Sequence, residues 1–153
     1  PFAEIVREIS DLADALVAAA LQLAHEEVDP RFPTAAEKVR FAVLAFGKHG
    51  ARELNYSSDV DLVFVMDADQ TPDDVQLRYA RRLAETFIGI LAAETGEGRC
   101  FRVDMRLQPE GKAGALVRSL AAFRQYYDRW AETWERQALI KARPVAGDTA
   151  LGE

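Results

Sequence analysis

Three acidic residues have the types and spacing expected of a metal-binding catalytic site. Asp59 and Asp61 flank Val60 in a run, DVDLVFVMD, that predicts a β-strand. Because side chains alternate across a strand, both carboxylates are expected on one face, with Val60 on the other. Neighbouring carboxylates raise each other's cost of ionisation, and a divalent cation removes that cost. The alternative for such a pair is two solvated acids at the entrance to a strand.

A third acid lies between two arginines in the run RCFRVDMRL, residues 99–107, which also predicts a strand. Alternation places Arg102, Asp104 and Arg106 on one face of it. Magnesium prefers a few carboxylates together with water and phosphate oxygens, and the arginine fork suits phosphate oxygens. Asp104 is therefore a predicted metal ligand, and Arg102 and Arg106 on either side of it are predicted to bind phosphate oxygens. A surface ion-pair ladder, which adds little stability, is the alternative.

A glycine-containing loop precedes the first acidic pair. Glycine after a strand lets the backbone approach a phosphate closely, so we expect phosphate contacts from Gly47 and Lys48, and a plain glycine turn is the alternative. Ser58 could contact phosphate or cap the turn before Asp59, and the two interpretations stand level. His49 and His25 are not expected to be ligands. Further along, charged residues could complete a basic wall, although solvated helix charges are the commoner explanation: Arg136, Lys141 and Arg143.

These side chains need strands and helices to position them. Strands are predicted over 40–46, 59–67 and 99–107, with a short further strand over 115–118. A helix should begin with a Thr71 cap and Pro72 at its first position, and Pro30 and Pro33 make residues 28–34 a connector. This helix should bury the stripe Ala80, Leu83, Ala84, Phe87, Ile88 and Leu91. Strands and helices in this order predict an α/β or α+β layer fold.

Two helices are predicted at the ends of the chain. The first should bury an aliphatic stripe of Ile5, Ile9, Leu12, Leu16 and Leu23. The last should run over residues 119–142, with an aromatic stripe in the core: Phe123, Tyr126, Tyr127, Trp130 and Trp134. A base-stacking surface is the minority interpretation of those aromatic residues.

The bulk properties are those of one globular domain. The chain has 153 residues, 49% hydrophobic and 29% charged, and a net charge of −6 with no dense basic run, so broad nucleic-acid binding is not expected. No apolar stretch could span a bilayer. Cys100, the single cysteine, is expected to be buried, and the absence of disulfides suits a cytoplasmic protein. Pro1 and the sequence of the last residues suggest a piece of a longer chain.

The segment from Gly47 to Leu62, GKHGARELNYSSDVDL, resembles the signature of the DNA polymerase β-like nucleotidyltransferase superfamily. Lys48 replaces the serine usual in that signature. Three blocks in order, GKHGARELNYSSDVDLVF, FRVDMRLQPEGKAGALV and YYDRWAETWERQALIKARPVAGD, are similar to the glutamine synthetase adenylyltransferase/adenylyl-removing enzyme family. This resemblance extends from about Phe41 to Asp148, which is most of the chain.

The resemblance implies a mixed sheet with flanking helices, a catalytic domain over 34–153 and an N-terminal helical segment and connector over 1–33. It implies two magnesium ions, one held by Asp59 and Asp61 and the other by both with Asp104, which would also accept a proton from an attacking hydroxyl. Implied partners are glutamine synthetase as protein substrate, ATP or ADP, and phosphate. A PII-type nitrogen signalling protein is expected to act through the full-length enzyme.

Members of that family carry two nucleotidyltransferase domains, one adding AMP to a tyrosine of glutamine synthetase and one removing it by phosphorolysis. Three features of this sequence resemble the N-terminal, removing half: the segment ELNYSSDVD, the RVDMRL block and the pair Tyr126-Tyr127. The adding half is the first alternative. A stand-alone nucleotidyltransferase and a non-catalytic nucleotide-binding module are further alternatives, disfavoured by the third block and by the intact acidic triad.

Overall fold

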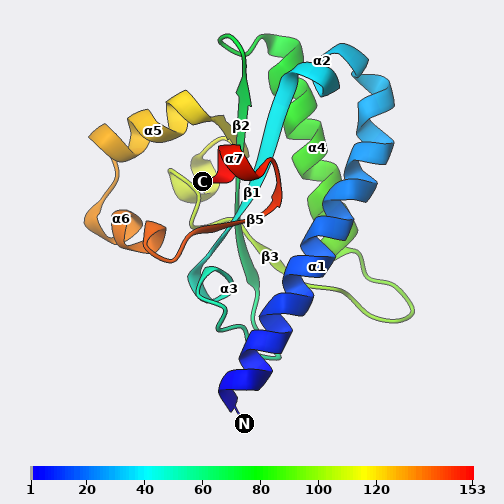
Figure 1. Cartoon of the computed structure of the whole chain (residues 1–153), viewed down its shortest axis with the longest axis vertical. Helices are drawn as coiled ribbons and strands as arrows, with labels where there is room; N and C mark the ends of the chain where they lie inside the picture. Colours follow the sequence, from blue (N-terminus) through cyan, green and yellow to red (C-terminus); the bar gives the residue numbers. More distant parts are fainter. Residues whose placement is uncertain (1) are drawn as a thin grey trace.

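A mixed five-stranded sheet flanked by helices forms the body of the protein in this computed structural model (Figure 1). The structure describes residues 2–153, so Pro1 lies outside the described residues. The strands are β1 Val39–Phe46, β2 Val60–Ala68, β3 Val103–Asp104, β4 Val117–Ser119 and β5 Arg143–Gly147. The helices are α1 Phe2–Val28, α2 Pro33–Lys38, α3 Gly47–Gly50, α4 Asp74–Ala92, α5 Leu120–Arg129, α6 Thr133–Leu139 and α7 Thr149–Gly152, with short 3-10 turns η1 Asp29–Arg31 and η2 Gly111–Ala113. The predicted α/β layer fold is confirmed.

The sheet is built around the antiparallel pair of β1 and β2. β5 adds to the other edge of β1 in antiparallel orientation. β3 and β4 both pair with β2 in parallel, β3 beside Val60–Asp61 and β4 beside residues 64–66. Two short strands that follow α4 in the chain therefore share one edge of β2. The edge position beside the start of β2 belongs to β3.

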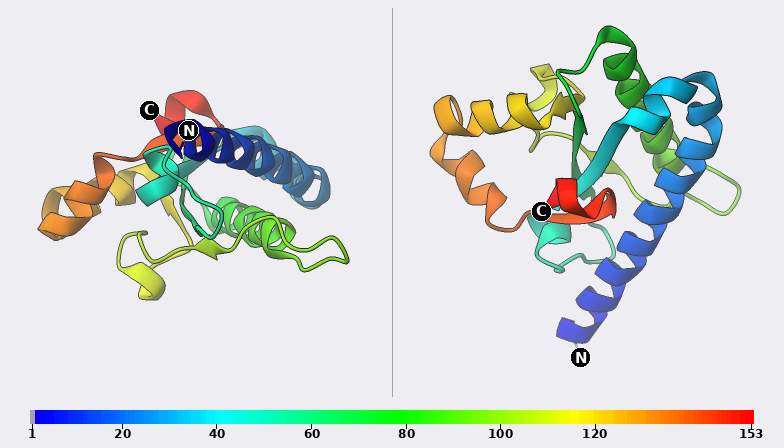
Figure 2. Two further views of the ribbon diagram at one scale, coloured as in Figure 1. Left: turned by 90° about the horizontal axis from the view of Figure 1, so that it is seen from below. Right: turned by 45° about the horizontal axis from the view of Figure 1, so that its top comes forward.

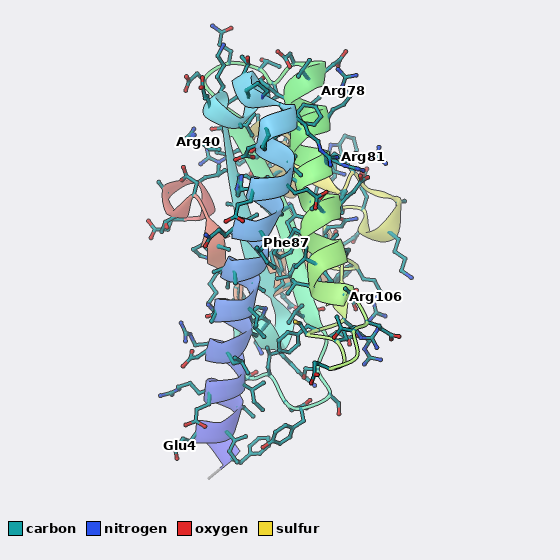
Figure 3. The ribbon with its side chains drawn as sticks, turned by 90° about the vertical axis from the view of Figure 1, so that its right-hand side faces the viewer. Glu4, Arg40, Arg78, Arg81, Phe87 and Arg106 are labelled. Carbon is teal, nitrogen blue, oxygen red and sulfur yellow. The ribbon has the colours of Figure 1, made fainter. Side chains whose placement is uncertain are left out.

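Helices α1 and α4 lie side by side on one face of the sheet (Figures 2 and 3). They cover alternate strand residues, and Val43 of β1, Leu62 and Phe64 of β2 are all buried there. Phe87 of α4 packs edge-to-face on Phe64, with ring centroids 5.4 Å apart. The predicted stripe of α4 is confirmed as core, with Ile88 partly buried at its margin.

The opposite face of the sheet carries the other alternate residues. Leu44, Phe46, Val63 and Val65 form a smaller core there, which includes Leu151 of α7. Side chains of α5 and the end of α6 pack against it. Since Asp61 has the same strand parity as Val63 and Val65, its side chain points to this thinly covered face.

The face of α1 that is buried differs from the predicted one. Leu12 and Leu23 are 57% and 51% exposed, and Ile5 is also exposed. The buried residues are smaller: Val6, Ser10, Ala13, Val17, Ala20, Leu21, Ala24 and Val28. The buried side chains are mostly small, which lets α1 approach α4 closely, while Ala15, Ala18 and Ala19 lie with Leu12 and Leu23 on the exposed side.

Helix α4 begins two residues later than predicted. Its N-cap is Asp73 and not Thr71: the Asp73 carboxylate accepts from the backbone N–H of Gln76 at 2.8 Å, and the Gln76 side chain accepts from the Asp73 N–H at 3.0 Å. This reciprocal pair satisfies two N–H groups at the helix start. The prolines limit α1 as expected, since it ends at Val28, although a short helix α2 begins at Pro33 inside the predicted connector.

Four further predictions about local structure are wrong. The strand over 99–107 shortens to Val103–Asp104, and the helix over 119–142 is broken at residues 130–132 into α5 and α6. Trp130 and Trp134 are 70% and 54% exposed, so the aromatic stripe is only partly core. Cys100 is exposed, because the short β3 leaves residues 99–102 outside the sheet. Among the described residues, none of the helices is both long and apolar enough to cross a bilayer.

Replacing Phe87, labelled in Figure 3, tests the packing of α4 on the sheet. Phe87→Ala should lower the free energy of unfolding by about 3–5 kcal/mol, because it leaves a cavity beside Phe64 at a fully buried position. Phe87→Leu, which retains most of the apolar volume, should cost about 1–2 kcal/mol. Urea denaturation followed by circular dichroism measures both. A loss below about 1 kcal/mol in Phe87→Ala would contradict this packing.

Candidate active site

The register of β2 and β3 brings the three predicted acids together. Asp61 lies opposite Asp104 in the parallel pairing, and Asp59 lies one residue before β2. The backbone N–H of Val60 donates to the carbonyl of Arg102 at 2.9 Å, which fixes this register next to Asp59. Val60 is fully buried in the core under α1 and α4, so Asp61 points to the other face, as alternation requires.

Asp61 is the most perturbed of the three acids. Its pKa is raised from 3.8 to about 6, first by burial and then by the negative charges of Asp104 and Asp59. Arg106 and Lys48 act in the opposite direction with smaller effect. A carboxylate with this pKa is destabilised by its own charge near neutral pH, and a nearby cation would relieve that cost.

The other two acids each face an arginine. Nε of Arg102 donates to Asp59 at 2.7 Å. Arg106 grips Asp104 through Nε at 2.8 Å, through Nη2 at 2.5 Å and through its backbone N–H at 2.9 Å. These hydrogen bonds hold the pKa of Asp104 below its usual range. Both guanidinium groups stay largely exposed, at 61% and 69%, so they can also reach a ligand in solvent. Figure 3 shows Arg106 below the end of α4.

Gly47 approaches the central acid more closely than any other residue type could. It has a φ of +54°, and a Cβ at this position would lie 2.3 Å from Oδ2 of Asp61. Glycine is therefore required here both for its backbone conformation and for space. The backbone of this loop was expected to approach a phosphate; in the structure it approaches the carboxylate of Asp61.

The remaining predicted residues lie around this centre. Lys48 follows Gly47 in α3 and is exposed, and its charge acts on Asp61. The Ser58 hydroxyl donates to Oδ1 of Asn55 at 2.8 Å and accepts from the Asn55 N–H at 3.1 Å, so it closes the turn before Asp59. An open pocket of about 330 Å³ adjoins Asp59 and is lined by Tyr56, Ser57, Ser58, Arg99, Cys100, Phe101 and Arg102.

One charged group near the site escaped the sequence analysis. The Lys112 ammonium, in η2, contributes to lowering the pKa of Asp104. Lys112 follows a glycine in a loop, and this position gave little signal in the sequence.

Arg143, expected in a basic wall, instead makes a bidentate ion pair with Asp14 of α1, at 2.8 and 2.9 Å. His49 is fully buried, and its Nε2 lies 2.8 Å from the same carboxylate.

Burial raises the pKa of Asp14, but the hydrogen bonds from Arg143 and His49 outweigh it and leave that pKa below its usual value. Burial also lowers the pKa of His49. Both shifts favour an ionised Asp14 beside a neutral imidazole at neutral pH. Lys141 pairs with Glu53 at 3.4 Å, and Arg136 donates to the carbonyl of Ala131 at 3.3 Å, so neither forms a wall with Arg143.

The donor set fits a hard divalent cation in its chemistry. Asp59, Asp61 and Asp104 supply only carboxylate oxygens, the ligands that magnesium prefers, and they are close enough to perturb one another's charge. Among residues 2–153, however, no three acidic, histidine or cysteine side chains converge tightly enough to hold an ion as they stand. Asp59 and Asp104 are turned toward their arginines.

Comparison with known proteins gives this geometry its context. The family of glutamate-ammonia ligase adenylyltransferases matches residues 1–153. The chain belongs to this family. It is 48% identical over 98% of its length to a bifunctional glutamine synthetase adenylyltransferase/adenylyl-removing enzyme of Streptomyces coelicolor, and 45% identical over 98% to one of Cutibacterium acnes. A relative from Corynebacterium glutamicum with the same name is 46% identical over the whole chain.

Membership of the adenylyltransferase family confirms the resemblance seen in the sequence blocks. The chain spans 13–15% of the length of these relatives, whose names cover both the adding and the removing reaction.

The raised pKa of Asp61 gives a prediction about stability. The folded value of about 6 exceeds the unfolded value of 3.8, so the native state binds this proton more tightly. The charge of Asp61 therefore reduces stability as pH rises through that window, and has no effect below about pH 4. With divalent cations chelated, Asp61→Asn should raise the free energy of unfolding at pH 7.5 by about 1–2 kcal/mol, allowing for solvent screening.

Urea denaturation at pH 7.5, 5 and 4 measures this effect, and the gain should vanish at the lowest pH. Asp69→Asn provides the control, because Asp69 is an exposed acid just beyond the end of β2. It should change stability by less than about 0.5 kcal/mol at each pH. An Asp61→Asn protein no more stable than wild type at pH 7.5 would show that Asp61 carries no electrostatic cost.

Proposed function

We propose that this chain is a magnesium-dependent nucleotidyltransferase domain that acts on a tyrosine of glutamine synthetase, and that it removes AMP from that tyrosine by phosphorolysis. One observation supports this most strongly: Asp61 lies opposite Asp104 across parallel strands, with Asp59 two residues before it. The family membership and the names of the relatives support the substrate.

In this reaction an oxygen of inorganic phosphate attacks the α-phosphorus of adenylyl-tyrosine. The bond between phosphorus and the tyrosine oxygen breaks, the tyrosine oxygen takes a proton, and the products are ADP and tyrosine. Transfer in the adding direction would use the same groups, with the tyrosine hydroxyl attacking ATP and Asp104 accepting its proton. Since phosphate is already anionic, removal needs little help from a base.

The side chains divide into two roles. Asp59, Asp61 and Asp104 would hold magnesium, which when bound neutralises charge on the phosphate oxygens. Arg102 and Arg106 would bind phosphate oxygens with their exposed guanidinium groups, and each also orients its neighbouring acid. Arg106 in addition keeps Asp104 ionised by lowering its pKa.

Weaker phosphate contacts would come from the loops before β2. Lys48 would add positive charge beside Asp61, and the backbone around Gly47 would limit how the phosphates can approach. Ser58 would act mainly through the turn that it closes with Asn55, which sets the position of Asp59. A PII-type signalling protein would act through the full-length enzyme and not on these groups directly.

The assignment to the AMP-removing reaction rests on sequence motifs. The ELNYSSDVD segment, the RVDMRL block and Tyr126-Tyr127 resemble the N-terminal halves of the family. An assay of the full-length protein on adenylylated glutamine synthetase, with magnesium and phosphate, decides the matter through ADP release. This chain would instead be the adding half if Asp61 were needed for AMP transfer from ATP to unmodified synthetase but not for ADP release. Binding of nucleotide without either reaction would indicate a non-catalytic module.

The acids should differ from an ordinary surface aspartate in their effect on turnover. Asp61→Ala should abolish ADP release, and Asp104→Asn should reduce it at least about 100-fold, because each removes a carboxylate from the proposed metal site. Asp67→Ala is the matched control: Asp67 lies at the other end of β2 and pairs with Arg40 at 2.5 Å. Full turnover by a folded Asp61→Ala protein would refute the assignment.

Removal of divalent cations tests the metal independently of mutation. Activity should be lost with a chelator and should return when excess magnesium is added, because the carboxylate oxygens of the protein and the phosphate oxygens of the substrate repel one another without a cation. Asp104→Asn should require a higher magnesium concentration for half-maximal activity than wild type. Turnover that persists through extensive chelation would contradict the proposed cofactor.

A further inference from the structure

A buried polar cluster joins three parts of the chain that are far apart in sequence. Asp14 comes from α1, His49 from α3 and Arg143 from the first position of β5. The Asp14 carboxylate accepts two bonds from Arg143, at 2.8 and 2.9 Å, and lies 2.8 Å from Nε2 of His49. The His49 side chain is fully buried, and the other two are only about one-fifth exposed.

The cluster also binds the backbone of the glycine loop. Nη2 of Arg143 donates to the carbonyl of His49, and Nε donates to the carbonyl of Gly50, both at 3.2 Å. Together with the His49 side chain, these contacts attach the last two residues of α3 to Asp14. The guanidinium fork suits this task, since one planar group bonds a carboxylate and two carbonyls at once.

The loop has little freedom to sit elsewhere. A Cβ on Gly50 would lie 2.1 Å from the carbonyl oxygen of Lys141 and 2.8 Å from that of Ala45. At the other end, Gly47 packs directly on the carboxylate of Asp61. A displacement of the loop by one ångström would therefore change the surroundings of Asp61 and the position of Lys48.

From these contacts we infer that Asp14 is a positioning residue for the acidic site: through His49 and Arg143 it holds the Gly47–Gly50 loop against Asp61. This inference rests on the function proposed above. Asp14 touches neither Asp61 nor any group proposed to hold phosphate, and it acts only by fixing the loop. Helix α1 then carries a positioning residue for the site and is not only a cover for the sheet.

The test compares two substitutions on the same helix in the full-length protein. Asp14→Asn keeps the shape of the side chain but weakens its bonds to Arg143 and His49. Glu8→Gln is the control, because Glu8 is an exposed acid on the same helix, six residues before Asp14 and away from the loop. Hydrogen exchange of the backbone N–H groups of residues 51–53, which donate to the carbonyls of Gly47, Lys48 and His49, reports on the loop without any assay of activity.

Asp14→Asn should speed exchange of those amides about 10-fold or more and lower kcat by about 10- to 100-fold, since small misplacements of catalytic groups have effects of this size. Glu8→Gln should leave both within about two-fold. A residue with a merely structural role would lower the melting temperature and leave kcat per folded molecule unchanged. Unchanged loop exchange, or faster exchange with normal kcat, would overturn the inference.

A second variant covers the case in which Asp14→Asn does not fold. Arg143→Lys retains a positive charge for Asp14 but cannot bond both loop carbonyls, so it should show the same loss of kcat with a smaller change in stability. Normal kcat and normal loop exchange in Arg143→Lys would overturn the inference equally. The proposed function fails separately: Asp61→Ala would then retain full turnover, whatever Asp14→Asn does to the loop.

Discussion

The central constraint in this protein is the half-buried charge of Asp61. Burial and two neighbouring carboxylates raise its pKa to about 6, so near neutral pH the folded chain holds an ionised group at an energetic cost. The nearby features all bear on that cost. Gly47 leaves space for the carboxylate, Arg106 and Lys48 offset part of the repulsion, and the register of β3 sets how close Asp104 comes. Such an arrangement is costly for stability and useful for binding cations, which is the usual trade-off at active sites.

The sheet meets this constraint by using its two faces differently. The face under α1 and α4 is a thick apolar core that contains Val60, Leu62 and Phe64, and it supplies rigidity. The acids project from the opposite face, where the covering layer is smaller, with Asp59 36% exposed and Asp104 12% exposed. Parallel pairing with two short strands lets β2 bring a distant acid to its edge, since β3 needs only two paired residues to place Asp104.

Strong local patterns in the sequence were sufficient for much of this. The runs that became β1 and β2 are nearly continuous apolar segments, and the stripe of α4 has a clear helical period, so these elements were predicted to within one or two residues. The failures occurred where the pattern was ambiguous. On α1, apolar residues are spread around much of the helix, so the aliphatic stripe did not mark the buried face, which packing against α4 determined. After α4, alternation suggested a long third strand, but most of it has no neighbouring strand to pair with.

The site shows the same division between local and long-range information. The D-x-D spacing and the acid between two arginines were readable because each motif lies within a few residues, although the pairing of Arg102 with Asp59 requires the folded sheet. The cluster of Asp14, His49 and Arg143 was not readable, because its members are separated by 35 and 94 residues or more and each is an ordinary residue type in its own segment. They come into contact only because α1 packs beside α3 and β5 in the folded protein. Because a charged carboxylate and a guanidinium with little exposure are costly to separate, this packing couples the position of the first helix to the position of the loop beside Asp61.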